Sequence, residues 1–125
     1  MPSFQARVKI WLSKCFTHDI ATDVSERNHR FIEEALELVQ STGCTADEAH
    51  KLVDYVFSRP IGETRQEVGG VAVTFSALCS ALGISQAMAA EEELKRISEP
   101  DIMAKVREKH KRKPALSPLP GLYPD

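Results

Sequence analysis

The chain has 125 residues and a mass of 13.9 kDa, which is the size of one domain. Its hydrophobic fraction of 42% and charged fraction of 27% are typical of globular proteins and exclude collagen, a coiled-coil rod and a wholly disordered chain. No apolar run approaches the roughly 20 residues that cross a bilayer, and no secretory signal is evident. We therefore expect a cytoplasmic protein without a membrane partner.

The net charge of −2 is divided unevenly along the chain. Residues 1–104 carry 10 Lys/Arg and 16 Asp/Glu, whereas residues 105–125 carry 6 and 2. An acidic body argues against nucleic acid as the main partner, because duplex affinity depends on cationic contacts with phosphate. It suits a protein that gathers carboxylates around metal ions. Cys15, Cys44 and Cys79 are odd in number and far apart, so we expect free thiols, with Cys79 in the core.

Apolar residues at helical spacing dominate the first half of the chain. They predict a helix over 4–16, then a short polar stretch over 17–22. Asp23 and Glu26 have capping-box spacing and begin the second helix, which Gly43 ends through a left-handed turn. Thr45, with Glu48 as its capping-box partner, begins the third helix, and Pro60 and Gly62 follow its end.

The fourth helix is predicted over 63–82, with a strand near 71–75 as the rival interpretation. Its broad apolar surface predicts burial on several sides, and Gly83 is its stop. A fifth helix begins at Ser85, and a charged helix continues over 101–113. The last twelve residues contain four prolines and predict a tail, so the fold is an all-α bundle of about four to six helices, with one domain over 1–113 and a tail over 114–125.

Two pairs of carboxylates carry the functional signal. Glu34 and Glu37 are three apart, so they share one helix face, where they can bind Mg²⁺ or form a solvated acidic edge. Glu63 and Glu67 are four apart at the start of the fourth helix. Pairs of carboxylates from two neighbouring helices can build a metal site, although Glu63 is equally explained by its favourable interaction with the helix dipole.

Candidate substrate-binding residues flank these acids. Arg30 and Arg65 suit phosphate because a guanidinium donates two parallel hydrogen bonds, although Arg30 equally suits an intrahelical salt bridge with Glu34. Asn28 can contact a base or sugar. Trp11 can stack on a nucleobase, but its place on an apolar helical face favours the core. The basic run over 105–113 is either a solvated surface or a cover over a triphosphate in a neighbouring subunit.

The run Glu33-Glu34-Ala35-Leu36-Glu37, followed one helix later by Glu67-Val68-Gly69-Gly70, resembles the MazG-like all-α nucleoside triphosphate pyrophosphohydrolases of phages and bacteria. Their pattern is EExxE and then ExxD, and the resemblance covers roughly residues 11–113. It implies a hydrolase that uses Mg²⁺, with Mn²⁺ as a substitute, to convert an NTP or dNTP to the monophosphate and pyrophosphate. It also implies a homodimer or homotetramer.

Carried over by position, Glu34, Glu37 and Glu67 are metal ligands, and Glu33 is a supporting or water-orienting carboxylate. The chain departs from the pattern at Gly70, which stands where the family has an aspartate. Glu63 or a water molecule can fill that place. The alternatives are a catalytically degenerate nucleotide-binding protein of the same fold, and an interaction module that acts through its basic, proline-rich C-terminus.

Overall fold

The computed structural model describes residues 2–111, and every regular element in that range is an α-helix, which confirms the all-α prediction. The predicted tail over 114–125 and the last two residues of the charged helix lie outside the described residues. There are seven helices in the described range, rather than four to six. They are α1 (Phe4–Cys15), α2 (His18–Thr22), α3 (Val24–Ser41), α4 (Ala46–Phe57), α5 (Thr64–Leu82), α6 (Gln86–Ile97) and α7 (Pro100–Lys111).

Local capping explains most helix boundaries. Asp23 accepts a 2.8 Å hydrogen bond from the Glu26 amide at the start of α3, and Thr45 forms the predicted capping box with Glu48 at the start of α4. Gly43 and Gly83 both have positive φ, at 100° and 68°, where a side chain would strain the backbone. The described residues contain no strand at 71–75, because α5 continues without interruption to Leu82.

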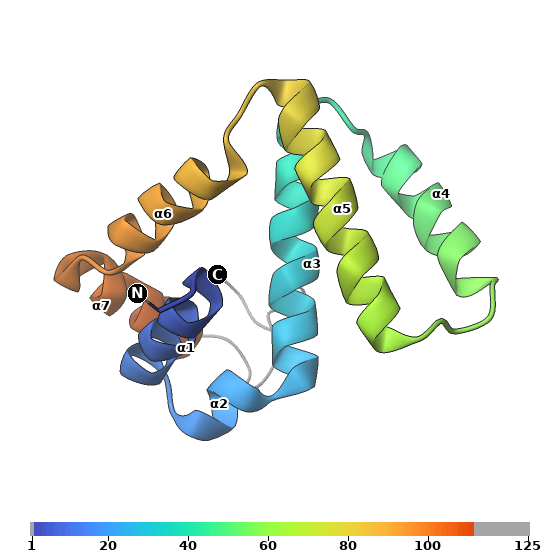
Figure 1. Cartoon of the computed structure of the whole chain (residues 1–125). Helices are drawn as coiled ribbons and strands as arrows, with labels where there is room; N and C mark the ends of the chain where they lie inside the picture. Colours follow the sequence, from blue (N-terminus) through green and yellow to red (C-terminus); the bar gives the residue numbers. More distant parts are fainter. Residues whose placement is uncertain (1, 112–125) are drawn as a thin grey trace.

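The polar stretch over 17–22 differs from the prediction. It contains the five-residue helix α2, whose first turn is capped by the Thr17 hydroxyl accepting from the Ile20 amide. A single helical turn is too short for a hydrophobic period to reveal it. This short helix joins α1 to α3 and sets the direction in which α3 leaves the packed part of the molecule (Figure 1).

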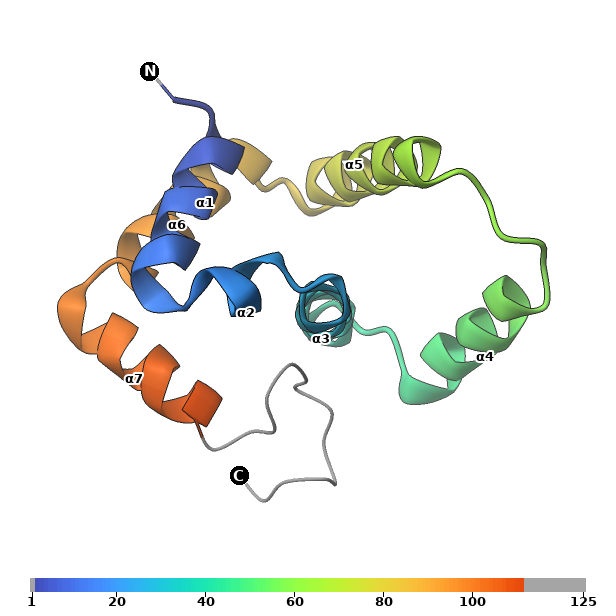
Figure 2. The ribbon, with the colours of Figure 1, turned by 90° about the horizontal axis from the view of Figure 1, so that it is seen from below.

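The helices form two unequal parts on either side of α3. In Figures 1 and 2, α1, α2, α6 and α7 gather on one side of α3, while α4 and α5 extend on the other. The closest packing is between α1 and α2, α1 and α7, α6 and α7, and α2 and α3. We call α1, α2, α6 and α7 the packed side of the molecule.

Side chains from distant parts of the sequence hold the packed side together. The Trp11 indole donates a 2.9 Å hydrogen bond to the Ile97 carbonyl, so Trp11 belongs to the packing between α1 and α6, as the core interpretation predicted. Arg7 forms an ion pair with Glu91 that also joins α1 to α6. Arg107 of α7 donates to the backbone carbonyl at the end of α1. Cys15 and Cys79 are buried, and all three thiols are free.

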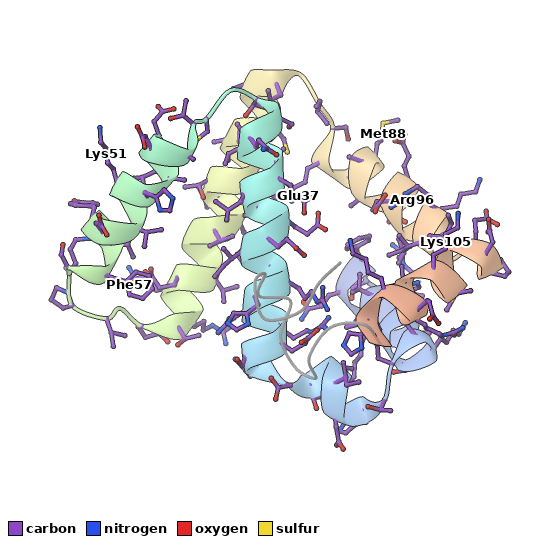
Figure 3. The ribbon with its side chains drawn as sticks, turned by 180° about the vertical axis from the view of Figure 1, so that it is seen from behind. Glu37, Lys51, Phe57, Met88, Arg96 and Lys105 are labelled. Carbon is purple, nitrogen blue, oxygen red and sulfur yellow. The ribbon has the colours of Figure 1, made fainter. Side chains whose placement is uncertain are left out.

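Most apolar side chains of α3, α4 and α5 remain exposed. The prediction that α5 is buried on several sides does not hold within one chain, because Cys79 is its only buried residue in the described range. Figure 3 shows Phe57 at the outer end of α4, where its side chain is 85% exposed. Among the described residues, no single helix is long and apolar enough to cross a membrane. The pair α5 and α6 together has the length and composition of a membrane span, but the chain bends by 98° between the two helices.

Candidate functional site

The first carboxylate cluster lies on the middle of α3. Partial burial raises the pKa of the Glu34 carboxyl, and repulsion from Glu37 and Glu33 raises it further. The three acids therefore interact as the EExxE spacing predicted. Nearby like charges disfavour the ionised form of Glu34, so a cation or a proton at Glu34 would relieve this repulsion.

Charges on two further helices influence the pKa of Glu34. Glu93 of α6 also raises the pKa of Glu34, whereas Lys109 of α7 lowers it. Arg96 of α6 holds Glu93 through two parallel 2.8 Å hydrogen bonds, which lower the pKa of Glu93. Figure 3 shows this side of the molecule, with Glu37 on α3 and Arg96 on α6. Acidic and basic side chains of three helices thus influence one another here, and we call this site the α3–α6–α7 cluster.

The local sequence gave no signal for Glu93 or Arg96 as members of this site. They lie more than fifty residues after Glu37, in an acidic and basic stretch that resembles any solvated helix surface. Lys109 belongs to the basic run over 105–113, for which the sequence predicts a solvated surface or a cover over a triphosphate in a neighbouring subunit. In the structure its charge acts on Glu34 of the same chain, because α7 packs back against α1.

The second carboxylate pair does not join the first within one chain. Glu63 is the N-cap of α5, and its carboxylate accepts a 2.6 Å hydrogen bond from the Gln66 amide, as the helix-terminus interpretation predicted. Glu67 bends back toward the loop, where a Cβ at Gly62 would lie 3.2 Å from its Oε1 atom. Within residues 2–111, no three His, Cys, Asp or Glu side chains come close enough to hold a metal ion.

Gly70 lies in regular α5 helix with open space beside it. A Cβ built there meets no other atom within 4 Å, apart from the helix's own neighbouring backbone. Packing within one chain therefore does not explain the glycine. An aspartate at this position is sterically allowed, which makes Gly70→Asp a practical test of the missing ligand.

The arginine nearest the acids is held by a buried carboxylate. Arg30 donates a 2.9 Å hydrogen bond to Glu26 and lies 3.9 Å from Glu33. This agrees with the salt-bridge interpretation, but the partners are Glu26 and Glu33 rather than Glu34. Asn28 is exposed on α3, and Arg65 is exposed in the first turn of α5. The structure therefore leaves Asn28 and Arg65 accessible, while Arg30 is engaged in the fold.

Glu26 is the most deeply buried side chain among the described residues, with an exposed fraction of 0%. Besides Arg30, its Oε1 atom lies 3.4 Å from Arg27 and 3.5 Å from Nε2 of His110. Burial lowers the pKa of His110, although attraction to Glu26 opposes this. The sequence predicted Glu26 as a capping partner only. Its structural role is to join α3 to α7, close to the α3–α6–α7 cluster.

An open groove runs between α3 and α4, with a volume of about 490 Å³. Glu33 and Glu37 line it together with His29 and His50, and the rest of its lining is mostly apolar. The acids of α3 thus border two spaces, since Glu34 faces α6 and α7 while Glu33 and Glu37 border the groove.

No protein family model, curated protein or solved structure matches this chain. The fold and the site define an all-helical protein with a carboxylate cluster flanked by basic side chains. The function must be argued from these residues.

Proposed function

We propose that this protein is a Mg²⁺-dependent nucleoside triphosphate pyrophosphohydrolase, with Mn²⁺ as a possible substitute metal. The observation that supports the proposal is the raised pKa of the Glu34 carboxyl, which partial burial and repulsion from Glu37, Glu33 and Glu93 produce, while the charge of Lys109 opposes it. Hard carboxylate oxygens are the ligands Mg²⁺ prefers, and a cation relieves that repulsion. Lysine and arginine beside the acids provide charge for phosphate oxygens.

The proposal gives each of these side chains a role. Glu34 and Glu37 are the ligands on α3, and Glu33 orients the attacking water or supports a ligand. Lys109 and Arg96 attract the triphosphate, while Asn28 and Arg65 are accessible for the base, sugar or phosphates. When bound, Mg²⁺ supplies charge neutralisation, a hold on the phosphate oxygens and a lowered pKa of its water.

The incomplete second motif favours one alternative function. Gly70 lacks a ligand side chain, and Glu67 lies apart from the α3 acids within one chain. Both observations are expected of a protein that binds nucleotide without hydrolysing it. The two functions differ in turnover, and they share the prediction that Mg²⁺ and a nucleotide bind.

Phosphorus NMR of reaction mixtures tests the proposed function and the bond that is cleaved. The protein is incubated with a panel of canonical and modified NTPs and dNTPs, each with Mg²⁺, with Mn²⁺ and with EDTA. We expect a monophosphate and pyrophosphate, formed only with metal. Diphosphate and inorganic phosphate would contradict the assigned cleavage between the α and β phosphates.

A panel without any turnover would contradict the enzymatic proposal for the natural chain. Gly70→Asp then separates the causes. Hydrolysis gained by this variant would identify the missing ligand as the reason, and metal-dependent nucleotide binding without hydrolysis would support the alternative.

A further inference from the structure

The last turn of α7 meets α3 at a buried carboxylate. Nε2 of His110 lies 3.5 Å from Oε1 of Glu26, whose side chain is fully buried, and the His110 side chain itself is only 13% exposed. The His110 ring also contacts Phe16, with 4.9 Å between the ring centroids. Since α7 packs mainly on α1 and α6, its link to α3 depends on His110.

Positive charges already outnumber negative ones on the α3 side of His110. Arg30 lies 2.9 Å and Arg27 lies 3.4 Å from Oε1 of Glu26, so two guanidinium groups share one buried carboxylate. Three buried atoms at this junction have no hydrogen-bond partner among the described residues, namely Oε2 of Glu26, Nε of Arg27 and Nε2 of His110. Buried polar atoms without partners cost free energy, so the junction contributes little net stability. A protonated His110 would add a third cation to this group.

The other neighbours of His110 are basic or neutral. His110 lines a recess of about 300 Å³ together with Lys14 of α1 and Arg107 of α7, and no Asp or Glu of the described residues lines it. Cys15 also lines the recess, and burial raises the pKa of its thiol, so it supplies no negative charge there. Glu26 is therefore the acid that faces the ring, and it is already paired with arginine.

We propose that His110 and Glu26 form a pH-sensitive latch, which holds the last turn of α7 on α3 at neutral pH and releases it when His110 takes up a proton. A proton on the docked ring places a further positive charge in a partly buried group of cations, whereas a proton on the released ring is solvated by water. Burial and the nearby arginines accordingly lower the pKa of His110, although attraction to Glu26 opposes them.

The pH range of the latch follows from the two states of the ring. A released His110 in water has an ordinary pKa of about 6.5, and the docked ring takes up a proton only at lower pH. Docking is therefore fully favoured above about pH 6.5. Below that pH its equilibrium constant falls by up to about tenfold for each pH unit, until the docked ring is protonated as well.

Release of the latch would also change the charge around the α3–α6–α7 cluster. Lys109 is the residue before His110, and its charge acts on Glu34. When the last turn of α7 leaves α3, this charge is withdrawn from Glu34. The latch itself does not rest on the proposed enzymatic function, since docking of α7 is measured without metal or nucleotide.

Hydrogen exchange of the full chain, followed by mass spectrometry at pH 7.5, 6.5 and 5.5, tests the latch. After correction for the intrinsic pH dependence of exchange, protection of residues 107–111 should fall by up to about tenfold between pH 6.5 and 5.5, while α3 keeps its protection. His110→Asn should abolish this loss, because asparagine can donate a hydrogen bond to Glu26 but does not titrate. His18→Asn is the matched control, since His18 is exposed at the start of α2, and it should behave like the wild type.

Three outcomes would overturn the proposal. They are constant protection of residues 107–111 across the pH range, an equal loss of protection in α3, and a loss in His110→Asn as large as in the wild type. If His110→Asn leaves residues 107–111 unprotected even at pH 7.5, Arg27→Gln decides in its place. This variant keeps His110 but removes one cation beside Glu26, so it should lose less protection than the wild type between pH 6.5 and 5.5. An unchanged loss in Arg27→Gln would exclude the latch.

Discussion

Replacing Glu26 with glutamine should destabilise the fold far more than any other single neutralisation of an acid on α3. Glu26 is fully buried and receives a 2.9 Å hydrogen bond from Arg30, with Arg27 at 3.4 Å. Removing one partner of a buried ion pair costs about 3–5 kcal/mol, because the remaining charge is left uncompensated. Both arginines are about 30% exposed and glutamine still accepts a hydrogen bond, so we expect about 2–3 kcal/mol.

Urea unfolding at one fixed protein concentration measures this loss, and Glu33→Gln is its control. Glu33 interacts with the same Arg30, but at 3.9 Å and with a side chain that is 39% exposed. An exposed pair contributes about 0–1 kcal/mol, so the control should lose about 0.5 kcal/mol or less. With a slope of about 1–2 kcal/mol per molar urea, Glu26→Gln should lower the urea midpoint by about 1–3 M. Equal losses in the two variants would refute the reasoning from burial.

Three further predictions concern charge and assembly. Glu34→Gln should stabilise the metal-free protein, because it removes the repulsion between Glu34 and the neighbouring acids. The gain should be only about 0.5 kcal/mol, because solvent screens this side chain. A thermal unfolding scan with EDTA measures the gain, and an unchanged or lower melting temperature would contradict the prediction. Because the pKa of His110 is lowered in the folded protein, the unfolded chain binds protons more readily, and the free energy of unfolding should fall as the pH drops below about 6.5. His110→Asn should make the free energy of unfolding depend less on pH between pH 7.5 and 5.5. An unchanged pH dependence would show that other groups cause it. If a dimer brings α5 of one copy beside the Glu37 side of the groove, a mixture of Glu37→Gln and Glu67→Gln chains refolded together should recover about a quarter of wild-type pyrophosphate release, whereas no recovery would place both acids in one chain's site.

The helices could be predicted from the sequence because their signals are local. The Thr45 hydroxyl and Glu48 carboxylate satisfy backbone amides within three residues, and Gly43 and Gly83 provide left-handed turns where helices end. The helix α2 could not be predicted in this way, since five residues contain no hydrophobic period.

The candidate site could be predicted only where its residues share a helix. Glu34 and Glu37 interact as their spacing indicated, because the helical rise fixes their separation. Glu93 and Lys109 reach the same place through the packing of α6 and α7, which no local pattern encodes. The burial of Glu26 was hidden for the same reason, since His110 approaches it from the other end of the described chain.

The expected burial of α5 shows a different limit of prediction from sequence. Its apolar residues do predict a covered surface, but they do not say whether the cover comes from the same chain or from a second copy. Within one chain, Val68 and Val71 remain exposed.

Pyrophosphate release by wild type, Glu37→Gln and Glu99→Gln, measured side by side with Mg²⁺, tests the central claim most directly. Glu99 is an exposed acid at the junction of α6 and α7 and serves as the matched control. We predict release by the wild type and the Glu99 variant, and a loss of at least about a hundredfold in Glu37→Gln, as expected when a ligand of the catalytic metal is removed. Equal rates in all three proteins, or no release from the folded wild type, would contradict the account.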